Sequence, residues 1–142
     1  MCAEAPTYTV SFYFRKILVP IDGSESAYRA LEVAADLARH YGSRVIVIYV
    51  KPKGAVLQRD QDPIVKAKER LRSAPLNLTY KYLEYDPTVE SPSSVLVKEI
   101  SSEGYDLVVI GARGKTLLSD LNIGSTALSL VVNSATSLFI VR

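Results

Sequence analysis

The strongest constraint on the fold is the alternation of two apolar periodicities along the chain. The segment "KILVPI" (residues 16–21) is a short apolar run, and "RVIVIYV" (residues 44–50) is nearly continuous and β-branched. Such runs are typical of strands that are covered on both faces. The segment between them carries apolar residues at helical spacing, namely Ala27, Ala30, Leu31, Ala34, Leu37 and Ala38. Gly42 is well placed to end this helix, so the pattern predicts a strand, a helix and a parallel strand.

The same unit repeats along the rest of the 142 residues, a length that suits one domain. Strands are expected at residues 78–85, 106–110 and 137–142. Helices are expected to begin near residue 63 and to cover about residues 92–103 and 124–133, the last with an apolar face of Ala127, Leu128, Val131 and Val132. Five strands then alternate with four helices. Right-handed crossovers predict an α/β fold with a single doubly wound five-stranded parallel sheet flanked by helices. Ligands of such sheets bind beyond the carboxyl ends of the strands, where the strand order reverses.

Composition excludes several classes of function. A formal net charge of +2 gives no broad positive field for nucleic acid. The basic segment "KAKERLR" (residues 66–72) also contains Glu69 and is interpreted as the solvated face of a helix. The chain shows neither a secretion signal nor a run of about 18 apolar residues, so we expect no membrane association. The single cysteine, Cys2, builds neither an internal disulfide nor a metal site, and it fits a reducing cytoplasm.

The segment "GARGKT" (residues 111–116) ends like a phosphate-binding P-loop. The P-loop pattern also needs a glycine five positions before Gly114, and that position is Val109. The loop is therefore too short to wrap a phosphate chain, and Lys115 is left outside the candidate site.

The glycines suggest an anion site of a different kind. Gly111 and Gly114 follow an expected strand, where backbone N–H groups could approach a ligand closely. Gly124, Ser125 and Thr126 open an expected helix, whose first turn offers N–H groups without intrahelical partners and a partial positive charge. The alternative is that the first two glycines serve a tight turn and that Ser125 or Thr126 is an N-cap. Spacing leaves both interpretations open.

Three segments together resemble the universal stress protein family. They are "KILVPIDGSESAYRALEVAADLA", "GYDLVVIGARG" and the pattern G-x2-G-x9-G-[ST] that Gly111, Gly114, Gly124 and Ser125 fill. The resemblance covers about residues 15–142. It leaves residues 1–14 as an N-terminal extension, whose segment "TYTVSFYF" is an edge strand, an interface arm or a disordered leader.

The resemblance implies an adenine nucleotide α-hydrolase-like fold and a bound adenine nucleotide. In the ATP-binding branch of the family, the glycine motif holds ribose and phosphates. The aspartate after the first strand contacts the ribose side, and the backbone at the end of the second strand pairs with adenine. These roles would fall on Gly111, Gly114, Gly124, Ser125 and Thr126, on Asp22, and on Val50 with Pro20 beside it. Magnesium would enter with the phosphates, near Asp22, although Asp22 could instead cap the first helix or its turn.

Three classes of function remain. The first is an ATP-binding regulatory protein of the stress-response type, with hydrolysis slow or incidental. The second is an ATP-hydrolysing or adenylate-forming enzyme of the α-hydrolase group, and the third is a nucleotide-free dimeric scaffold. No catalytic residue is assigned, because His40 is expected at the far end of the sheet, where it complements the dipole of the first helix. The family also implies a homodimer through Ser137–Val141, unless the N-terminal segment covers that edge.

Overall fold

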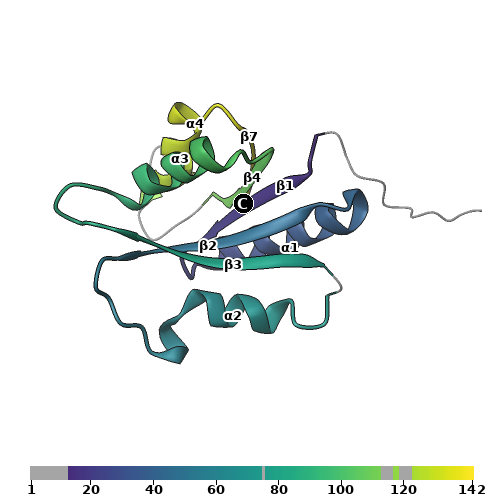
Figure 1. The fold of residues 1–142 in the computed structure, drawn as a ribbon, viewed down its shortest axis with the longest axis horizontal. Helices are drawn as coiled ribbons and strands as arrows, with labels where there is room; N and C mark the ends of the chain where they lie inside the picture. Colours follow the sequence, from purple (N-terminus) through teal and green to yellow (C-terminus); the bar gives the residue numbers. More distant parts are fainter. Residues whose placement is uncertain (1–12, 75, 113–116, 119–122) are drawn as a thin grey trace, which may run out of the picture.

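The core of the protein is one parallel sheet of five strands in the order β3-β2-β1-β4-β7 (Figure 1). The computed structural model describes residues 13–74, 76–112, 117–118 and 123–142. The strands of the sheet are β1 (Lys16–Ile21), β2 (Arg44–Pro52), β3 (Asn77–Tyr85), β4 (Leu107–Gly111) and β7 (Ser137–Val141). The chain winds from β1 through β2 to β3 in one direction and then adds β4 and β7 on the other side of β1. The predicted doubly wound fold is confirmed.

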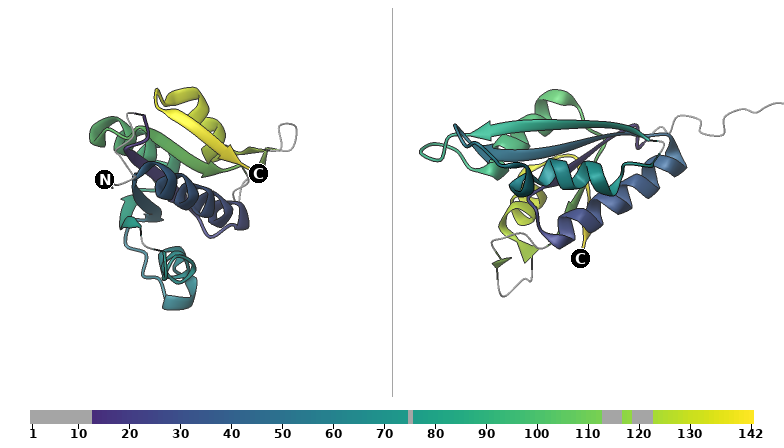
Figure 2. Two further views of the ribbon diagram at one scale, coloured as in Figure 1. Left: turned by 90° about the vertical axis from the view of Figure 1, so that its right-hand side faces the viewer. Right: turned by 90° about the horizontal axis from the view of Figure 1, so that it is seen from below.

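Four helices cover the two faces of the sheet. They are α1 (Glu25–Tyr41), α2 (Pro63–Arg70), α3 (Pro92–Glu103) and α4 (Ser125–Asn133). The helices α1 and α2 lie side by side along β1 and β2 (Figure 2) and share one apolar cluster with them. The helices α3 and α4 share a second cluster with the other face of the sheet.

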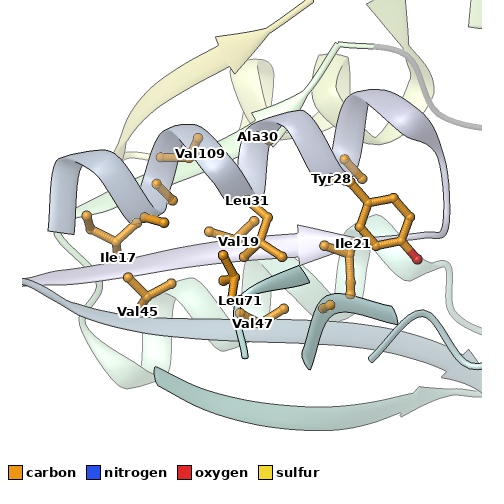
Figure 3. Packing of buried hydrophobic residues seen from close by; sticks show 14 of the residues in the cluster. Ile17, Val19, Ile21, Tyr28, Ala30, Leu31, Val45, Val47, Leu71 and Val109 are labelled. Atoms are coloured by element: carbon orange, nitrogen blue, oxygen red, sulfur yellow. The ribbon is translucent and has the colours of Figure 1, made fainter. Parts of the chain in front are cut away.

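The alternation of side chains along β1 explains why both clusters are continuous. Ile17, Val19 and Ile21 belong to the cluster on the α1 side of the sheet, and Figure 3 shows them spaced along β1 beneath that helix, with Leu31 beside Val19. Leu18 belongs to the cluster on the opposite face. Because both faces are covered by helices, every strand position near the centre favours an apolar residue, which is the continuous pattern seen in the sequence.

Local signals fix the ends of the helices. The Oγ of Ser24 accepts a hydrogen bond from the N–H of Ala27 and so caps α1. Gly42 ends that helix in the left-handed conformation at φ 71°, as expected. Asp62 caps α2 by accepting from the N–H of Ile64, and Ser91 caps α3 by accepting from the N–H of Ser94.

The expected apolar face of α4 is wrong at two of its four positions. Val131 and Val132 are 48% and 71% exposed, whereas Ala127 and Leu130 are buried. A helix of nine residues that packs on one side presents only a narrow stripe to the core, so apolar residues outside this stripe remain at the surface.

Three short elements were not predicted. They are a 3₁₀ turn, η1 (Arg59–Gln61), and a separate antiparallel pair formed by β5 (Leu117–Leu118) and β6 (Ile123–Gly124). Residues 1–12 lie outside the described part of the chain, so the expectation for the N-terminal extension stays a prediction. Among the helices that the structure describes, none has the length and apolar character needed to cross a membrane.

Candidate functional site

A crevice of about 500 Å³ opens at the carboxyl ends of β1, β2 and β4. The strand order reverses between β1 and β4, so the crevice lies at the place where doubly wound sheets bind their ligands. Its volume falls within the usual range for small-molecule sites, roughly 300–1,000 Å³.

The structure brings most of the residues predicted from the sequence to this one crevice. Seven of them line it, namely Pro20, Asp22, Val50, Gly111, Gly124, Ser125 and Thr126. The eighth, Gly114, lies outside the described residues, as do Arg113 and Lys115. Sequence reasoning missed a group of lining residues from the ends of β2 and β3 and from the start of α3, which includes Tyr49, Pro52, Tyr85, Ser91, Pro92 and Ser93.

The N-terminus of α4 forms one wall of the crevice. Gly124 is the N-cap residue, with φ −70° and ψ 154°, and Ser125 and Thr126 occupy the first two helical positions. The interpretation in which Ser125 or Thr126 is the N-cap is therefore wrong. The first N–H groups of a helix lack intrahelical acceptors and carry partial positive charge, so this wall can attract an anion. None of the described lining residues is a lysine or an arginine, which leaves this attraction to backbone groups.

The opposite wall is the end of β2, which runs past the end of β1. The last β1–β2 pair is Ile21 with Tyr49, whereas β2 continues beside β3 until Pro52 pairs with Tyr85. The N–H of Lys53 donates to the carbonyl of Tyr85, so this peptide group points to β3. Because peptide groups of alternate residues point to opposite edges, those of Val50 and Pro52 point to the β1 side, beyond its last residue.

Asp22 has a structural bond as well as a place in the crevice. Its Oδ1 accepts a 2.9 Å hydrogen bond from the N–H of Ser24, the N-cap residue of α1. The interpretation of Asp22 as a residue that stabilises this turn is therefore confirmed. Asp22 is also the one carboxylate among the described lining residues. A carboxylate has two oxygens, so the bond to Ser24 leaves acceptor capacity for a ligand or a cation.

Gly111 is required by packing, whatever else it does. A Cβ at this position would lie 2.5 Å from the Oγ of Ser26, 2.6 Å from the carbonyl carbon of Ser26 and 2.8 Å from the N atom of Ala27. Two of these three atoms are backbone, so a side chain at residue 111 would push the first turn of α1 away from β4. The sequence suggested ligand approach or a tight turn, and the close approach of α1 adds a third reason.

Ala112 connects the crevice to the C-terminal strand. Its N–H donates a 2.7 Å hydrogen bond to the carbonyl of Val141, and its carbonyl accepts a hydrogen bond from the N–H of Gly124. Ala112 is buried. The end of β7 and the start of α4 are thus joined through a single residue.

Two further groups complete the chemistry of the region. Burial raises the pKa of the Tyr49 hydroxyl, and the negative charge of Asp62 adds to the effect, so Tyr49 stays a neutral hydrogen-bonding group. His40 lies in the last turn of α1, where it was expected, and is exposed. Since α1 begins beside the crevice and ends at the other end of the sheet, His40 is remote from the site.

Known proteins resemble this chain over most of its length. The family model for the universal stress protein family matches residues 13–142. A universal stress protein of Thermus aquaticus is 26% identical over 136 residues, which cover 91% of this chain and 99% of the relative.

Two solved structures share the fold. One is a universal stress protein in complex with cAMP, with TM-score 0.70, 21% identity and coverage of 92% of this chain and 98% of its own. The other is the universal stress protein from Archaeoglobus fulgidus in complex with dAMP, with TM-score 0.63, 21% identity and coverage of 93% and 100%. The matched family model spans nearly the whole described chain, and this chain belongs to the universal stress protein family.

Proposed function

We propose that this protein is a regulatory protein of the stress response that binds ATP in the crevice and signals through its nucleotide-dependent state. The observation that carries the proposal is the pairing of two walls across one crevice. One wall is the N-terminus of α4, which suits phosphates, and the other is the open end of β2, which suits the edge of a base. The relatives solved with cAMP and dAMP support an adenine nucleotide as the class of ligand.

The phosphates would lie against Gly124, Ser125 and Thr126. Backbone N–H groups at a helix start bind phosphate without a cationic side chain. The hydroxyls of Ser125 and Thr126 add donors on the same wall. Adenine would lie at the other end of the crevice, where Ile48, Val50 and Leu96 supply apolar surface around the backbone of β2. Gly114 is also proposed to contact ribose and phosphates, because it fills a glycine position of the family pattern.

We propose that magnesium binds together with the phosphates and that Asp22 is its protein ligand. Mg²⁺ prefers oxygen ligands and usually combines one or two carboxylates with phosphates and water. The crevice matches this preference, because Asp22 is its one described carboxylate. When bound, the ion would neutralise phosphate charge. Asp22 would orient the ion while its Oδ1 accepts the hydrogen bond from the N–H of Ser24.

Hydrolysis of ATP is proposed to be slow. Fast hydrolysis needs a group that takes a proton from the attacking water or orients it. Asp22 is the one carboxylate among the described lining residues, and its Oδ1 already accepts from the N–H of Ser24. The protein would therefore report the presence of nucleotide, and we place it in the cytoplasm, where ATP is abundant.

A homodimer through β7 is proposed for the assembled protein. The strand β7 forms one edge of the sheet, and Phe139 on this strand is 44% exposed. Val131 and Val132 on α4 add exposed apolar surface near the end of the preceding helix. Pairing Ser137–Val141 with its twin across a two-fold axis would bury this edge.

Equilibrium dialysis of the purified protein against radiolabelled ATP with magnesium tests the proposal. We expect saturable binding of one ATP per chain, and adenine nucleotide in the acid extract of freshly purified protein. Release of pyrophosphate with a second substrate would favour the enzyme alternative. A protein that retains no nucleotide and binds none would favour the scaffold alternative and contradict the proposal.

A further inference from the structure

We propose that the side chain of Tyr85 stacks against the base of the bound nucleotide. This role rests on the proposed nucleotide site and goes beyond it, because the roles that the family implies fall on other residues. Three features of the structure support it, namely the face of the sheet on which Tyr85 lies, the open strand end beside it and the turn that fixes its backbone.

Tyr85 lies on the face of the sheet that α3 and α4 cover. Successive side chains of a strand point to opposite faces. On β3, Leu78 and Tyr80 pack against the cluster formed with α1 and α2, whereas Leu83 packs against the cluster formed with α3 and α4. Tyr85 follows Leu83 by two residues, so its side chain points to the side of α3 and α4.

The base would lie on the same side of the sheet. Adenine is proposed at the open end of β2, and Val50 and Leu96, which supply apolar surface there, belong to the cluster with α3 and α4. Val50 pairs with Leu83, so Tyr85 is the next residue of β3 that points to this side, and it lines the crevice. Tyr49 is the other aromatic residue among the described lining residues, and it packs against the cluster on the opposite face.

The end of β1 leaves the crevice open beside Tyr85. The strand β1 stops at Ile21, which pairs with Tyr49, whereas Tyr85 pairs with Pro52, three residues further along β2. Tyr85 is half-buried, so part of its surface is accessible to a ligand. It is thus supported by the sheet and still available for binding.

The backbone of Tyr85 is fixed before a ligand binds. Its carbonyl accepts a 2.8 Å hydrogen bond from the N–H of Lys53. The next residue, Asp86, donates its N–H to Glu90 Oε1 at 2.9 Å and accepts from the N–H of Thr88 through Oδ1 at 3.0 Å. A binding wall that is already positioned needs little ordering when the ligand arrives, so binding loses less conformational entropy.

An aromatic ring at this position suits a nucleotide base. Every base has a π face, and stacking of a base on an aromatic side chain contributes about 5- to 150-fold in affinity. Stacking uses the ring of tyrosine and not its hydroxyl group. Phenylalanine should therefore replace Tyr85 in this role, whereas an aliphatic side chain should not.

Titration calorimetry of the full-length chain with ATP and magnesium tests this role. We expect Tyr85→Leu to bind ATP about 5- to 150-fold more weakly than the unmodified protein. Tyr85→Phe keeps the ring and should stay within about twofold of the unmodified affinity. Tyr13→Leu is the control, because Tyr13 is 78% exposed and lies outside the crevice, and it should leave ATP affinity unchanged.

Unchanged ATP affinity in a folded Tyr85→Leu protein would overturn the inference, as would equal losses in Tyr85→Leu and Tyr85→Phe. If Tyr85→Leu does not fold, tyrosine fluorescence decides the question, since the chain contains no tryptophan. The decrease in emission on addition of ATP should be smaller in Tyr85→Phe than in Tyr13→Phe, and an equal decrease would overturn the inference. Failure of the unmodified protein to bind ATP would instead overturn the proposed function itself.

Discussion

Gly111 and Ser26 approach each other so closely that a methyl group on residue 111 would lie 2.6 Å from the carbonyl carbon of Ser26. This contact joins the end of β4 to the first turn of α1, two elements that are far apart in the sequence and that both border the crevice. The contact gives Gly111 a structural role that is independent of its proposed role in nucleotide binding.

Gly111→Ala is expected to destabilise the protein even without a ligand. The new methyl group would meet backbone atoms that belong to α1, so the helix must move, and overpacking of this kind costs about 1–3 kcal/mol. Urea unfolding of the nucleotide-free protein measures the loss. Gly104→Ala is the control, since a Cβ added at residue 104 would meet no atom within 4 Å apart from its chain neighbours, and only the left-handed backbone is strained, at about 1–2 kcal/mol. A Gly111→Ala protein as stable as the unmodified one would contradict the packing argument.

Gly124→Val is expected to weaken ATP binding while the fold is retained. The backbone of Gly124 has ordinary extended angles, φ −70° and ψ 154°, so valine meets no backbone strain there. Its side chain would instead occupy space proposed for phosphate, at a cost of about 1–3 kcal/mol, which is about 5- to 150-fold in affinity. Titration calorimetry measures the change, with Ser129→Ala on the same helix as control. Full ATP affinity in a folded Gly124→Val protein would remove the phosphate assignment.

Replacement of Asp22 is expected to separate its two roles. Asp22→Ala loses the bond to the N–H of Ser24 and should cost about 0.5–1.5 kcal/mol of stability, whereas Asp22→Asn keeps an oxygen acceptor and should restore most of it. Both variants lose the carboxylate, so both should weaken the dependence of ATP binding on magnesium. Dialysis of ATP with and without magnesium measures this dependence.

ATP turnover by the unmodified protein should stay far below about 10 per second. Fast hydrolysis that is abolished by Asp22→Ala would show that Asp22 is catalytic.

Phe139→Glu is expected to convert the proposed dimer to a monomer. The charge would stand on the exposed edge of β7, where pairing with a second chain would bury it. Light scattering at micromolar concentration gives the mass, and Val56→Glu serves as control, because Val56 is 92% exposed in a connecting loop. If the intact protein is already a monomer and only a variant lacking residues 1–14 dimerises, the N-terminal segment covers the edge and the dimer proposal fails.

Stability is expected to fall at alkaline pH through Tyr105. The Tyr105 hydroxyl donates a 2.7 Å hydrogen bond to Glu99 Oε2, which also accepts from Lys81 Nζ at 2.9 Å. Burial, followed by the contact with Glu99, raises the pKa of Tyr105 above its usual value of about 10. The unfolded chain therefore loses this proton first, so the contribution to stability is complete below about pH 10 and declines as the pH rises further. The free energy of unfolding should be measured between pH 9 and 11, which is roughly the span over which tyrosine titrates in the unfolded chain. It should decline less steeply with pH in Tyr105→Phe than in Tyr13→Phe, the exposed control.

The fold was predictable because each element carries its own signal. Ser24 and Gly42 mark the two ends of α1, and the β-branched run before Tyr49 marks a strand covered on both faces. These signals depend only on nearby residues, so a single sequence contains them. The face of α4 was predicted less well, because the burial of Val131 and Val132 depends on how far the neighbouring elements extend, and they prove to be exposed.

The candidate site was predictable where a motif supplied it and not elsewhere. Asp22 and Gly124 belong to local patterns, whereas Pro52 and Tyr85 reach the crevice only because β2 and β3 run past the end of β1. The relative lengths of paired strands follow from register, which is a property of the assembled sheet. The contact of Gly111 with Ser26 was unpredictable for the same reason, since it needs the position of α1 over β4.

Ala112 links the proposed dimer interface on β7 to the proposed nucleotide site at the start of α4. Its two backbone bonds, to Val141 and to Gly124, leave it little freedom to follow one neighbour without moving the other. A ligand that shifts the start of α4 would therefore also shift the end of β7. A second chain bound to β7 would in the same way shift the start of α4. Thermodynamic reciprocity then requires that nucleotide change the dimer dissociation constant by the same factor by which dimerisation changes nucleotide affinity.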